Sequence, residues 1–305
     1  MTAPDLSICI VSFNTRDLLR DCLGSIRESR QRSGLGVEVI VSDNASTDGS
    51  PEMVAAEFPE ARLIRNHENL LFARGSNVAA AGATGRYVLF LNSDTIVDCA
   101  ELAKMVRFLD GRPEAAICGP RLVDADGAPS PALPPLPAVW PYVKRALGLR
   151  PHRPGGAGDA PTQVEWVTGA CLLLRADVGR RLGWFDEGFP YYANAADLCH
   201  RARNHGLEVW YIPAATVVHL IGRSRERRPD AEEMQAREVV RGRLTLIAKH
   251  NPPARAWLLR ALFAAYVYRT TLTRWLGCLL TLGRSQRRRR RYEEARLLLA
   301  ALRHP

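Results

Sequence analysis

A chain of 305 residues, of which 47% are hydrophobic, can bury one substantial α/β core, and this composition excludes an intrinsically disordered protein. Its formal net charge of +10 is concentrated near the C-terminus, because residues 221–305 carry 20 Lys and Arg against 7 Asp and Glu. Such asymmetry is typical of a chain whose C-terminal part meets an acidic partner, which anionic lipid and nucleic acid both supply.

The cysteines and the N-terminus both indicate the cytoplasm. Seven cysteines occur without a CxxC pair, and Cys9, Cys118 and Cys171 lie in apolar runs, where they act as small core residues. Residues 1–5 are too short and too polar for a signal peptide. Arginines interrupt the most apolar region, so no uncharged stretch reaches the roughly 20 residues that cross a bilayer. We therefore expect a cytoplasmic protein that lies at most on a membrane surface.

The first 120 residues alternate strand-length apolar runs with amphipathic helical patterns. This alternation predicts an α/β fold with a mainly parallel sheet flanked by helices. In such sheets ligands bind outside the carboxyl ends of the strands, so the residues that follow each strand are the candidates for a site. The expected strands are 6–11, 37–42, 61–64, 87–91 and 115–118, and the expected helices are 15–29, 51–58, 73–83 and 99–109.

Proline and glycine crowd residues 128–161, which predicts a loop with one helix near 139–147. Regular structure is expected to resume at 164–174, followed by a short helix, a turn at 186–188, a helix near 197–205, and strands at 208–211 and 216–220. These patterns predict one domain over residues 1–225 and a separate tail over residues 226–305.

The tail is predicted to be helical and basic. Residues 230–250 form one amphipathic pattern, Pro252 and Pro253 interrupt it, and residues 254–282 form a second. On the second helix six apolar side chains recur at helical spacing, with the arginines turned largely away. We call these six the apolar stripe: Trp257, Ala261, Tyr268, Leu272, Trp275 and Leu279. An unbroken run of five arginines follows at 287–291.

Two aspartates follow predicted strands directly. Asp43 opens the segment Asp43-Asn-Ala-Ser-Thr-Asp48, where its carboxylate can accept hydrogen bonds from a nucleobase or a ribose. Asp94 ends the segment Leu91-Asn-Ser-Asp94, where a carboxylate can hold a divalent cation against a diphosphate leaving group. Taken singly, each segment also fits a turn that caps the helix that follows it.

Seven short motifs occur together and in order along residues 6–224. They are Val11-Ser-Phe-Asn14-Thr15, Asp43-Asn-Ala-Ser-Thr-Asp48, Asn66 to Asn69 before Phe72-Ala-Arg74-Gly75, Leu91-Asn-Ser-Asp94-Thr95, Trp166-Val-Thr-Gly-Ala-Cys171, Gly183-Trp-Phe-Asp-Glu187 and Val218-His219. In this order they resemble family 2 glycosyltransferases, in particular bacterial rhamnosyltransferase-like enzymes of cell-surface polysaccharide assembly.

The resemblance implies a GT-A fold, a dTDP-, UDP- or GDP-linked sugar donor, a divalent metal (Mg2+ or Mn2+) and inversion at the anomeric carbon. It assigns nucleotide binding to residues 1–127 and acceptor recognition to residues 162–225. Asp43 would hold the nucleobase, Asp94 the metal, and His219 the metal or the diphosphate, although on pattern alone His219 is more simply a core or strand-end histidine. The donor site would also include Ser12, Asn14, Asn44, Asn69, Arg74 and Asn92, and the acceptor region would include Gly169, Trp184, Asp186, Glu187 and Asn194.

The chain departs from the family pattern at the catalytic base. Where the family usually has a Glu-Asp pair, this chain has Asn194 and Ala195, and neither side chain can take a proton near neutral pH. Three explanations stay open: Asp197 or Asp186 replaces the base, the acceptor needs no strong base, or the chain is a catalytically silent binding partner. Asp197 also fits the N-cap of its own helix. A second departure is Leu71, where the family commonly has glycine and where leucine could narrow the donor pocket.

Enzymes of this kind commonly extend a glycan on a polyprenyl-diphosphate lipid, and the tail suits that acceptor. An apolar helical stripe followed by a polybasic run predicts peripheral attachment to the anionic inner face of the cell membrane. The alternative is that the stripe packs on the body of the protein or on a second subunit of a homodimer. Nucleic acid is not an expected partner, because no zinc spacing, reading motif or interleaved aromatic residue accompanies the arginine run.

Overall fold

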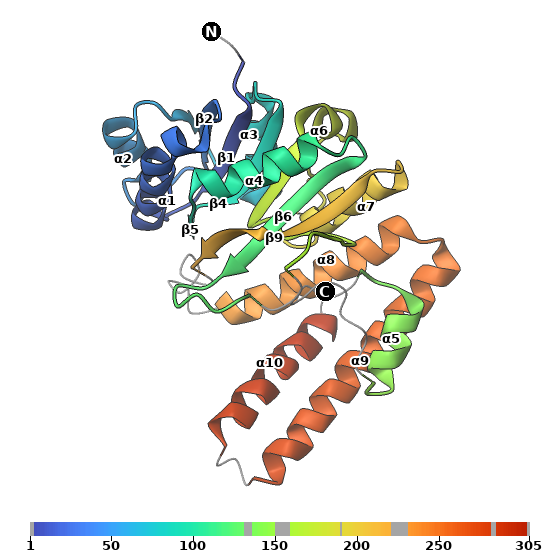
Figure 1. Ribbon diagram of the computed structural model, residues 1–305. Coiled ribbons are helices and arrows are strands. Elements are labelled where there is room, and N and C mark those ends of the chain that lie inside the picture. The colour runs from blue at the N-terminus through green and yellow to red at the C-terminus, as the bar shows by residue number, and fades with distance from the viewer. Residues whose placement is uncertain are drawn as a thin grey trace. The chain divides into compact units, whose positions relative to one another are not determined.

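The computed structural model describes residues 3–130, 136–149, 159–189, 191–220, 231–281 and 285–303 (Figure 1). The chain forms two compact units. The first contains Met1–Leu133 and Pro154–Arg225, and the second, which we call the helical unit, contains Pro134–Arg153 and Glu226–Pro305.

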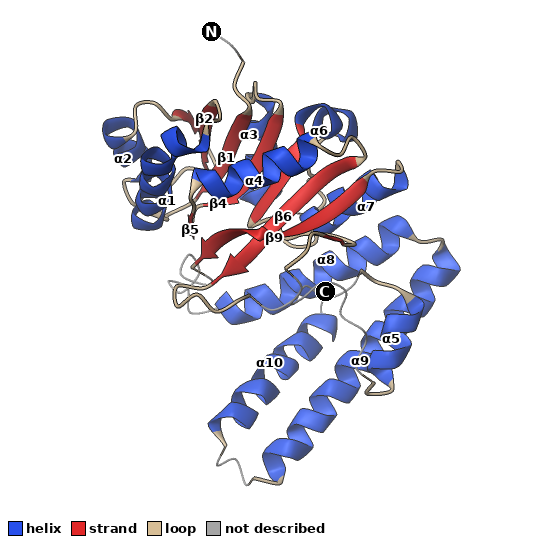
Figure 2. Ribbon diagram, viewed as in Figure 1, coloured by secondary structure: helices blue, strands red, loops and turns tan. Residues whose placement is uncertain are grey.

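A nine-stranded mixed sheet lies at the centre of the first unit (Figure 2). Its strand order is β3-β2-β1-β4-β8-β6-β9-β5, and β7 pairs with β9 outside this path. Strands β3, β2, β1 and β4 run parallel, whereas β8 runs antiparallel between β4 and β6. The strands are β1 (Leu6–Ser12), β2 (Val37–Asp43), β3 (Arg62–Arg65), β4 (Tyr87–Asn92), β5 (Thr95–Ile96), β6 (Ala115–Val123), β7 (Thr162–Gln163), β8 (Cys171–Arg175) and β9 (Glu208–His219).

Helices cover both faces of this sheet, because successive apolar residues of its strands point to opposite sides. Leu6, Ile8 and Ile10 of β1 are fully buried with residues of α1, α2 and α4, whereas Cys9 is buried with residues of α3, α6 and α7. Burial of each large aliphatic side chain contributes ~1.5–3 kcal/mol, which fixes the register of β1. The helices are α1 (Arg16–Ser29), α2 (Ser50–Glu57), α3 (Leu71–Ala81), α4 (Cys99–Asp110), α6 (Ala176–Leu182) and α7 (Asn194–Asn204), with a short 3-10 helix, η1 (Arg30–Ser33).

The described residues of the helical unit form helices around a small apolar core. This core contains Val240 and Ile247 of α8, Leu259 and Phe263 of α9, and Tyr142 of α5. The helices are α5 (Val139–Ala146), α8 (Ala231–His250), α9 (Pro253–Leu279) and α10 (Gln286–Arg303). None of the described helices is both long enough and apolar enough to span a membrane.

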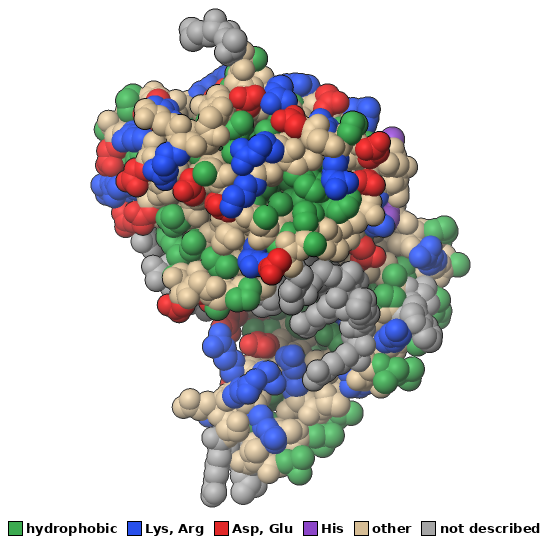
Figure 3. Space-filling model, viewed as in Figure 1, with side chains coloured by type: hydrophobic (Ala, Val, Ile, Leu, Met, Phe, Trp, Pro, Cys, Tyr) green, Lys and Arg blue, Asp and Glu red, His purple; other side chains and the backbone are tan. Residues whose placement is uncertain are grey.

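Helix α9 buries a different set of residues from the apolar stripe. Its buried residues are Ala256, Leu259, Phe263, Val267 and Thr271. The stripe itself is largely exposed, since Trp257 is 72% exposed, Leu272 54% and Trp275 43%. Exposed hydrophobic side chains lie beside Lys and Arg side chains on the helical unit (Figure 3). The apolar stripe therefore remains uncovered within the described part of the chain.

Cys9, Cys118 and Cys171 occupy core positions, as the sequence predicts. All seven cysteines lie in the described residues, and six are buried: Cys9, Cys22, Cys99, Cys118, Cys171 and Cys199. Burial raises the pKa of each of these six thiols, because a thiolate is poorly solvated in an apolar interior. Cys278 of α9 is partly exposed.

The elements that differ from the predictions have local causes. The strands expected at 208–211 and 216–220 form one strand, β9, which continues past an irregularity opposite Pro120. The loop expected over 128–161 supplies α5 and belongs partly to the helical unit, while its residues 131–135 and 150–158 lie outside the described part of the chain. The arginine run lies in α10, since arginine is a good helix former. Of the predicted tail helices, the end residues 230 and 282 also lie outside the described ranges.

Gly179 of α6 is expected to tolerate no side chain. A Cβ atom there would lie 1.9 Å from Cζ3 of Trp184, whose indole packs edge-on against Phe90. Gly179→Ala should therefore lower the free energy of unfolding by ~1–3 kcal/mol, as overpacking does. Gly24→Ala in α1 is the control, because nothing lies within 4 Å of that Cβ and alanine should add ~0.5–1 kcal/mol. Urea denaturation measures both, and equal effects would contradict the described packing of Trp184.

Candidate functional site

Parallel pairing brings the polar ends of three strands to one edge of the sheet. β1 lies between β2 and β4, with Ser12 opposite Asp43 and Val11 opposite Asn92. Neighbouring strands are ~5 Å apart, so Asp43 and Asn92 are about 10 Å from each other across β1. Asp94 follows Asn92 by two residues. The two aspartates singled out in the sequence therefore share one edge of the sheet.

Asp43 presents one carboxylate oxygen that no described residue satisfies. Its Oδ2 accepts a hydrogen bond from the Ser46 N–H at 2.9 Å, whereas its buried Oδ1 has no hydrogen-bond partner among the described residues. Burial raises the pKa of Asp43, while the hydrogen bonds from Ser46 and the positive charge of Arg65 act in the opposite direction. An unpaired buried acceptor costs ~1–3 kcal/mol, so this oxygen is suited to accept an N–H from a ligand.

Asn14 holds the loop that follows Asp43. Its Oδ1 accepts from the Thr47 N–H at 2.8 Å, and its own N–H donates to Ser46 Oγ at 2.9 Å. Asn14 has a φ of 54°, a left-handed value that asparagine tolerates better than most residues. The predicted donor residue Asn14 thus acts through the shape of the loop around Asp43.

Hydroxyl groups link the loop after β1 to the loop after β4. Ser12 Oγ lies 3.2 Å from Thr15 Oγ1, and Thr15 Oγ1 donates to Ser93 Oγ at 3.1 Å. All three side chains are buried. Ser93 precedes Asp94, so this chain of hydrogen bonds positions the second aspartate relative to β1.

Asn44 and Asn69 are used to hold the turn that opens α3. Asn44 Nδ2 donates to the carbonyl of Leu71 at 3.0 Å, and Asn69 Oδ1 accepts from the Leu71 N–H at 2.9 Å. Asn44 Oδ1 in turn accepts from Asn66 Nδ2 at 2.9 Å. Leu71 has a φ of 62°, a conformation that favours glycine. The left-handed backbone at position 71 explains why glycine is expected there. Leucine at this position stores backbone strain beside the loops that follow β2 and β3.

Asp94 and His219 bring an oxygen and a nitrogen donor together. Antiparallel pairing of β5 with β9 sets Thr95 opposite His219, and Asp94 Oδ1 lies 3.2 Å from His219 Nε2. Neighbouring ligands of an octahedral ion with bonds of ~2.1 Å are separated by about 3 Å. The observed separation therefore fits two adjacent ligands of one Mg2+ or Mn2+ ion. Asn92 Nδ2 lies 3.5 Å from the same His219 nitrogen.

A cation at this pair would need further ligands from outside the protein. No group of three or more His, Cys, Asp or Glu side chains that could hold a metal occurs in the described ranges. Hard divalent cations readily complete their shells with water and substrate phosphate oxygens. Asp94 and His219 thus fit a cation that binds together with a nucleotide diphosphate.

Arg74 lies at an exposed position on α3. Its Nη1 is 3.5 Å from Oε1 of Glu68, and both side chains are more than half exposed. An exposed ion pair of this length contributes little to stability. Arg74 is thus free to exchange Glu68 for an anionic ligand, although the structure gives it no contact with either site aspartate.

Gly169 marks the place where the segments of the predicted acceptor region meet. A Cβ atom on Gly169 would lie 3.5 Å from Cε1 of Phe72 and 3.6 Å from Cβ of Ala195. The Phe72 ring lies 5.7 Å from the Phe185 ring, measured between centroids. Asn194 and Ala195 are 4% and 3% exposed. The position expected to hold the base therefore belongs to this junction but carries no acid.

Asp197 is engaged in the interior and is not presented to a substrate. Its side chain is 0% exposed, and Oδ2 accepts a hydrogen bond from Nε of Arg201 at 2.7 Å. Arg201 also donates to the carbonyls of Leu182 and Trp184. Asp197 therefore orients an arginine that ties α7 to the end of α6. This geometry favours a structural role for Asp197 over that of a substitute base.

The turn after Phe185 carries the two other predicted carboxylates. Asp186 Oδ1 accepts from the Gly188 N–H at 2.8 Å and so shapes the turn itself. Glu187 is exposed, and its Oε1 lies 3.4 Å from Nδ2 of Asn77 on α3. Asn77 also exchanges two hydrogen bonds with the backbone of Phe185. Of Asp186, Glu187 and Asp197, Glu187 is the most accessible to an acceptor.

Trp184 packs beneath the predicted acceptor region. It has a φ of 59°, and its ring occupies the space over Gly179 and beside Phe90. This packing gives Trp184 a structural role.

Asn77 is a positioning residue that the sequence alone does not reveal. Its partner Phe185 lies 108 residues away in the chain, and a lone asparagine within a helix gives no local signal of such a contact. Thr15 and Asn66 stand inside quoted motifs, but their hydrogen-bond partners become apparent only when the strand order is known.

Comparison with known proteins assigns the family. The profile described as "Glycosyl transferase family 2" matches residues 7–161. The chain belongs to glycosyl transferase family 2. It is therefore a glycosyltransferase, and the predicted resemblance is confirmed. An N-acetylglucosaminyl-diphospho-decaprenol L-rhamnosyltransferase of Mycobacterium tuberculosis is 26% identical over 244 residues, which cover 73% of this chain and 78% of that relative. An O-antigen biosynthesis protein of Myxococcus xanthus is 30% identical over 75% of this chain and 18% of its own length.

Solved structures confirm the predicted GT-A fold of this family 2 chain. A mannosyltransferase from Pyrobaculum calidifontis, solved in complex with GDP-Man and Mn2+, has a TM-score of 0.62 at 18% identity, over 99% of this chain and 86% of its own. GalNAc-T7 with UDP, GalNAc and Mn2+ has a TM-score of 0.58 at 14% identity, over 81% of this chain and 48% of its own. Both neighbours thus bind Mn2+ beside a nucleotide or a nucleotide sugar.

Asp43 is expected to couple nucleotide binding to pH. Uracil, thymine and guanine each carry a ring N–H, and its hydrogen bond to Oδ1 would favour the ionised carboxylate. Binding should therefore lower the raised pKa of Asp43, release a proton, and strengthen as pH rises through that pKa. Calorimetry in buffers of different ionisation enthalpy counts the released protons.

The isosteric variant Asp43→Asn is the control for this coupling. It should lose the proton release and bind nucleotide at least ~10-fold more weakly, as loss of a charge-assisted hydrogen bond predicts. Because ionising a carboxyl with a raised pKa destabilises the folded state, the variant should be no less stable at neutral pH. Proton release that is unchanged in Asp43→Asn would exclude Asp43 as the coupled group.

Proposed function

We propose that this chain transfers a sugar, with inversion, from a nucleotide diphosphate donor to a lipid-linked or polysaccharide acceptor in cell-surface glycan assembly. The observation that carries the proposal is the shared sheet edge of Asp43 and Asp94, which lie on either side of β1. This spacing suits a donor whose base and diphosphate groups are bound at neighbouring points.

In this proposal the first unit recognises the donor through polar groups at the carboxyl ends of its strands. Asp43 accepts the ring N–H of the base, and the loop held by Asn14 fixes the position of that carboxylate. Asp94 and His219 hold a divalent cation, which when bound neutralises the negative charge that develops on the departing nucleoside diphosphate. Arg74 on α3 is a further candidate for contact with the phosphates.

Asp94→Asn is expected to remove the dependence of nucleotide binding on divalent cations. Without the anionic ligand, affinity for a nucleoside diphosphate in the presence of Mn2+ should fall by about 100-fold, towards the value without metal. Asp98→Asn is the matched control, because Asp98 caps α4 through the Ala100 N–H and asparagine caps equally well. Calorimetry with and without Mn2+ measures how nucleotide affinity depends on the cation. Metal-dependent binding that survives in Asp94→Asn would refute the cation site.

The sugar and the acceptor are proposed from the relatives. The Mycobacterium tuberculosis relative is named as a rhamnosyltransferase that acts on an N-acetylglucosaminyl-diphospho-decaprenol, and it aligns with most of both chains. We therefore propose rhamnose as the first sugar to test and a polyprenyl-diphosphate-linked glycan as the acceptor. Incubation with dTDP-rhamnose, UDP-sugars and GDP-mannose in turn, followed by mass spectrometry of the lipid, distinguishes these donors.

The absence of an acid at Asn194 and Ala195 supports a second candidate function, that of a silent binding partner. Asp197 is buried and paired with Arg201, so it is poorly placed to replace the missing general base. Glu187 is the alternative proton acceptor, since its side chain is exposed and approaches Nδ2 of Asn77, which also binds the backbone of Phe185. A silent partner would bind the nucleotide through the same Asp43 and Asp94 but would not turn it over.

Ala195→Asp tests whether the missing base limits turnover. A general base contributes ~100-fold to 10,000-fold, so the variant should raise the rate of sugar transfer within that range if the rest of the site is intact. Ala195→Asn is the control of matching size without an acid. If the wild-type chain is already active and Ala195→Asp adds nothing, Glu187→Gln should abolish activity. Turnover in none of these proteins would leave the silent partner as the function.

The helical unit is proposed to attach the enzyme to an anionic membrane. The five arginines 287–291 are exposed and lie in the first turns of α10, where the helix dipole disfavours positive charge. An anionic surface would compensate that cost, at about 1 kcal/mol per basic residue. The exposed apolar stripe of α9 supplies the hydrophobic contact that such attachment requires.

A further inference from the structure

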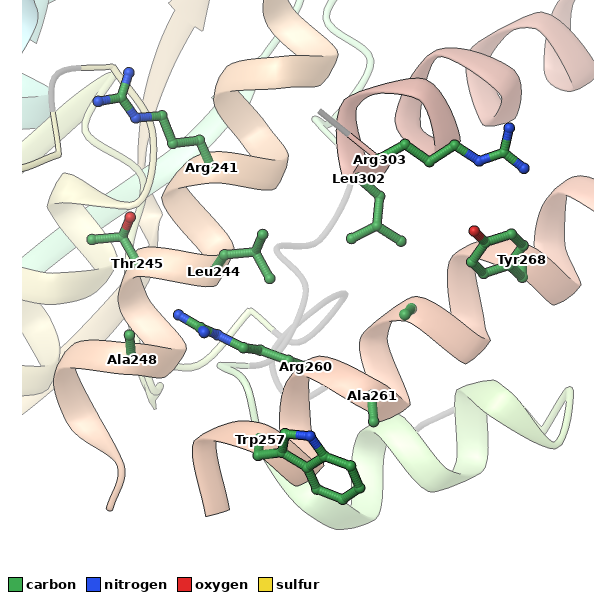
Figure 4. Close-up of a pocket in the computed structure, with 11 residues that line it drawn as sticks. Arg241, Leu244, Thr245, Ala248, Trp257, Arg260, Ala261, Tyr268, Leu302 and Arg303 are labelled. Carbon is green, nitrogen blue, oxygen red and sulfur yellow. The ribbon is translucent and has the colours of Figure 1, made fainter. Parts of the chain in front are cut away.

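A groove lies between α8, α9 and α10 inside the helical unit. Its volume is about 770 Å3, within the range of small-molecule sites. Aromatic residues Trp257 and Tyr268 line it from α9, and aliphatic side chains Leu244 and Leu302 line it from α8 and α10 (Figure 4). All of its lining residues belong to the helical unit, so the groove is built from other residues than the sheet edge of the first unit.

Three arginines line the same groove: Arg241, Arg260 and Arg303. Figure 4 shows Arg260 extending from α9 toward α8, Arg303 beside Tyr268, and Arg241 at the margin. Arg260 forms no hydrogen bond or ion pair with any described residue. Arg303 lies over the Tyr268 ring at 5.8 Å from its centroid, and Arg241 approaches Glu238 only at 3.9 Å. These cations are therefore poorly neutralised by carboxylates of the described chain.

Other arginines of the helical unit have clear structural partners. Arg243 donates to the Tyr142 hydroxyl, Arg269 to the carbonyl of Arg145, and Arg274 to the carbonyl of Arg291. Arg260 is exposed and lacks any such contact, and it lines the groove beside the apolar side chains Leu244 and Trp257. A ligand with a negative group is the natural complement of this position.

The groove continues into the exposed apolar stripe of α9. Trp257, Ala261 and Tyr268 belong to both, and beyond them Leu272 and Trp275 remain exposed along the helix. A helix of 27 residues is about 40 Å long. The apolar surface is therefore long and narrow, with Arg260 at its groove end and the arginines 287–291 near its other end. This shape matches a single extended hydrocarbon chain with an anionic head better than it matches a compact solute.

We infer that this groove binds an isoprenyl diphosphate, with the diphosphate at Arg260 and the hydrocarbon along the apolar stripe. The inference deepens the proposed function, on which the choice of an isoprenoid lipid rests, because it assigns the lipid part of the acceptor to named residues. The arginines of α9 are expected from the sequence to turn largely away from the stripe, and Arg260 is an exception, since it lines the same groove as Trp257.

The test measures retention of a radiolabelled long-chain isoprenyl diphosphate by the full-length chain in non-ionic detergent. The lipid should bind at least ~10-fold more tightly than the corresponding isoprenol or inorganic diphosphate, since each of these lacks one half of the contacts. Arg260→Gln should weaken lipid binding by ~10-fold, as loss of a charge-assisted contact predicts. Trp257→Ala should weaken binding of the lipid and the isoprenol but not of diphosphate.

Arg255→Gln is the matched control, because Arg255 is exposed on α9 but does not line the groove. It should leave lipid binding unchanged, and circular dichroism verifies that each variant keeps its helices. Equal losses in Arg255→Gln and Arg260→Gln would overturn the inference in favour of diffuse charge. Binding of the isoprenyl diphosphate that is insensitive to Arg260→Gln and is abolished by excess phosphatidylglycerol vesicles would place the lipid on the proposed membrane-binding surface and overturn the groove. A concentration-dependent dimer that Trp257→Ala dissociates would replace it with a self-association surface.

Nucleotide binding with Mn2+, measured on the same samples, separates this inference from the proposed function. Lipid binding that is lost in Arg260→Gln, in a chain that binds no nucleotide, would support the groove and refute the transferase mechanism. Metal-dependent nucleotide binding in a chain that retains no lipid would overturn the groove alone.

Discussion

The structure depends on the burial of β1 between two parallel neighbours. Because β1 is covered on both faces, its register with β2 and β4 is fixed, and the residues that end these strands must meet at one edge. Asp43 and Asp94 owe their proximity to this constraint and not to any contact between them. The buried Oδ1 of Asp43, which has no hydrogen-bond partner among the described residues, lies at this edge.

The fold was predictable where periodicity is strong and less so where pairing is remote. The strands and helices of residues 6–123 follow from apolar runs, and Asp43 and Asp94 follow from their positions after those runs. Local pattern could not reveal that β8 inserts antiparallel between β4 and β6, nor that α5 joins the helical unit. In the same way, Asp197 carries the sequence signature of an accessible acid or a helix cap, while its actual partner is Arg201. Burial and pairing of that kind arise from tertiary packing, which a single sequence does not encode in any short window.

The region of the missing base illustrates how a fold can be kept while its chemistry changes. Asn194 Oδ1 accepts a hydrogen bond from the Ala195 N–H, so the first turn of α7 is stabilised without a carboxylate. Gly169, Phe72 and Phe185 keep the neighbouring segments in contact with this helix. The substitution is therefore compatible with a stable protein, and its consequences fall on proton transfer. On the helical unit, the exposed apolar and basic surfaces are costly in water unless an apolar and anionic partner covers them.

The distribution of thiols gives this chain a practical property. Six cysteines are enclosed and resist ionisation, so an alkylating reagent under mild conditions will find Cys278 alone reactive. Cys278 lies three residues after Trp275, which puts the two side chains on neighbouring positions of α9. A polarity-sensitive fluorophore attached to the natural sequence would thus stand beside the apolar stripe and brighten whenever that surface leaves water.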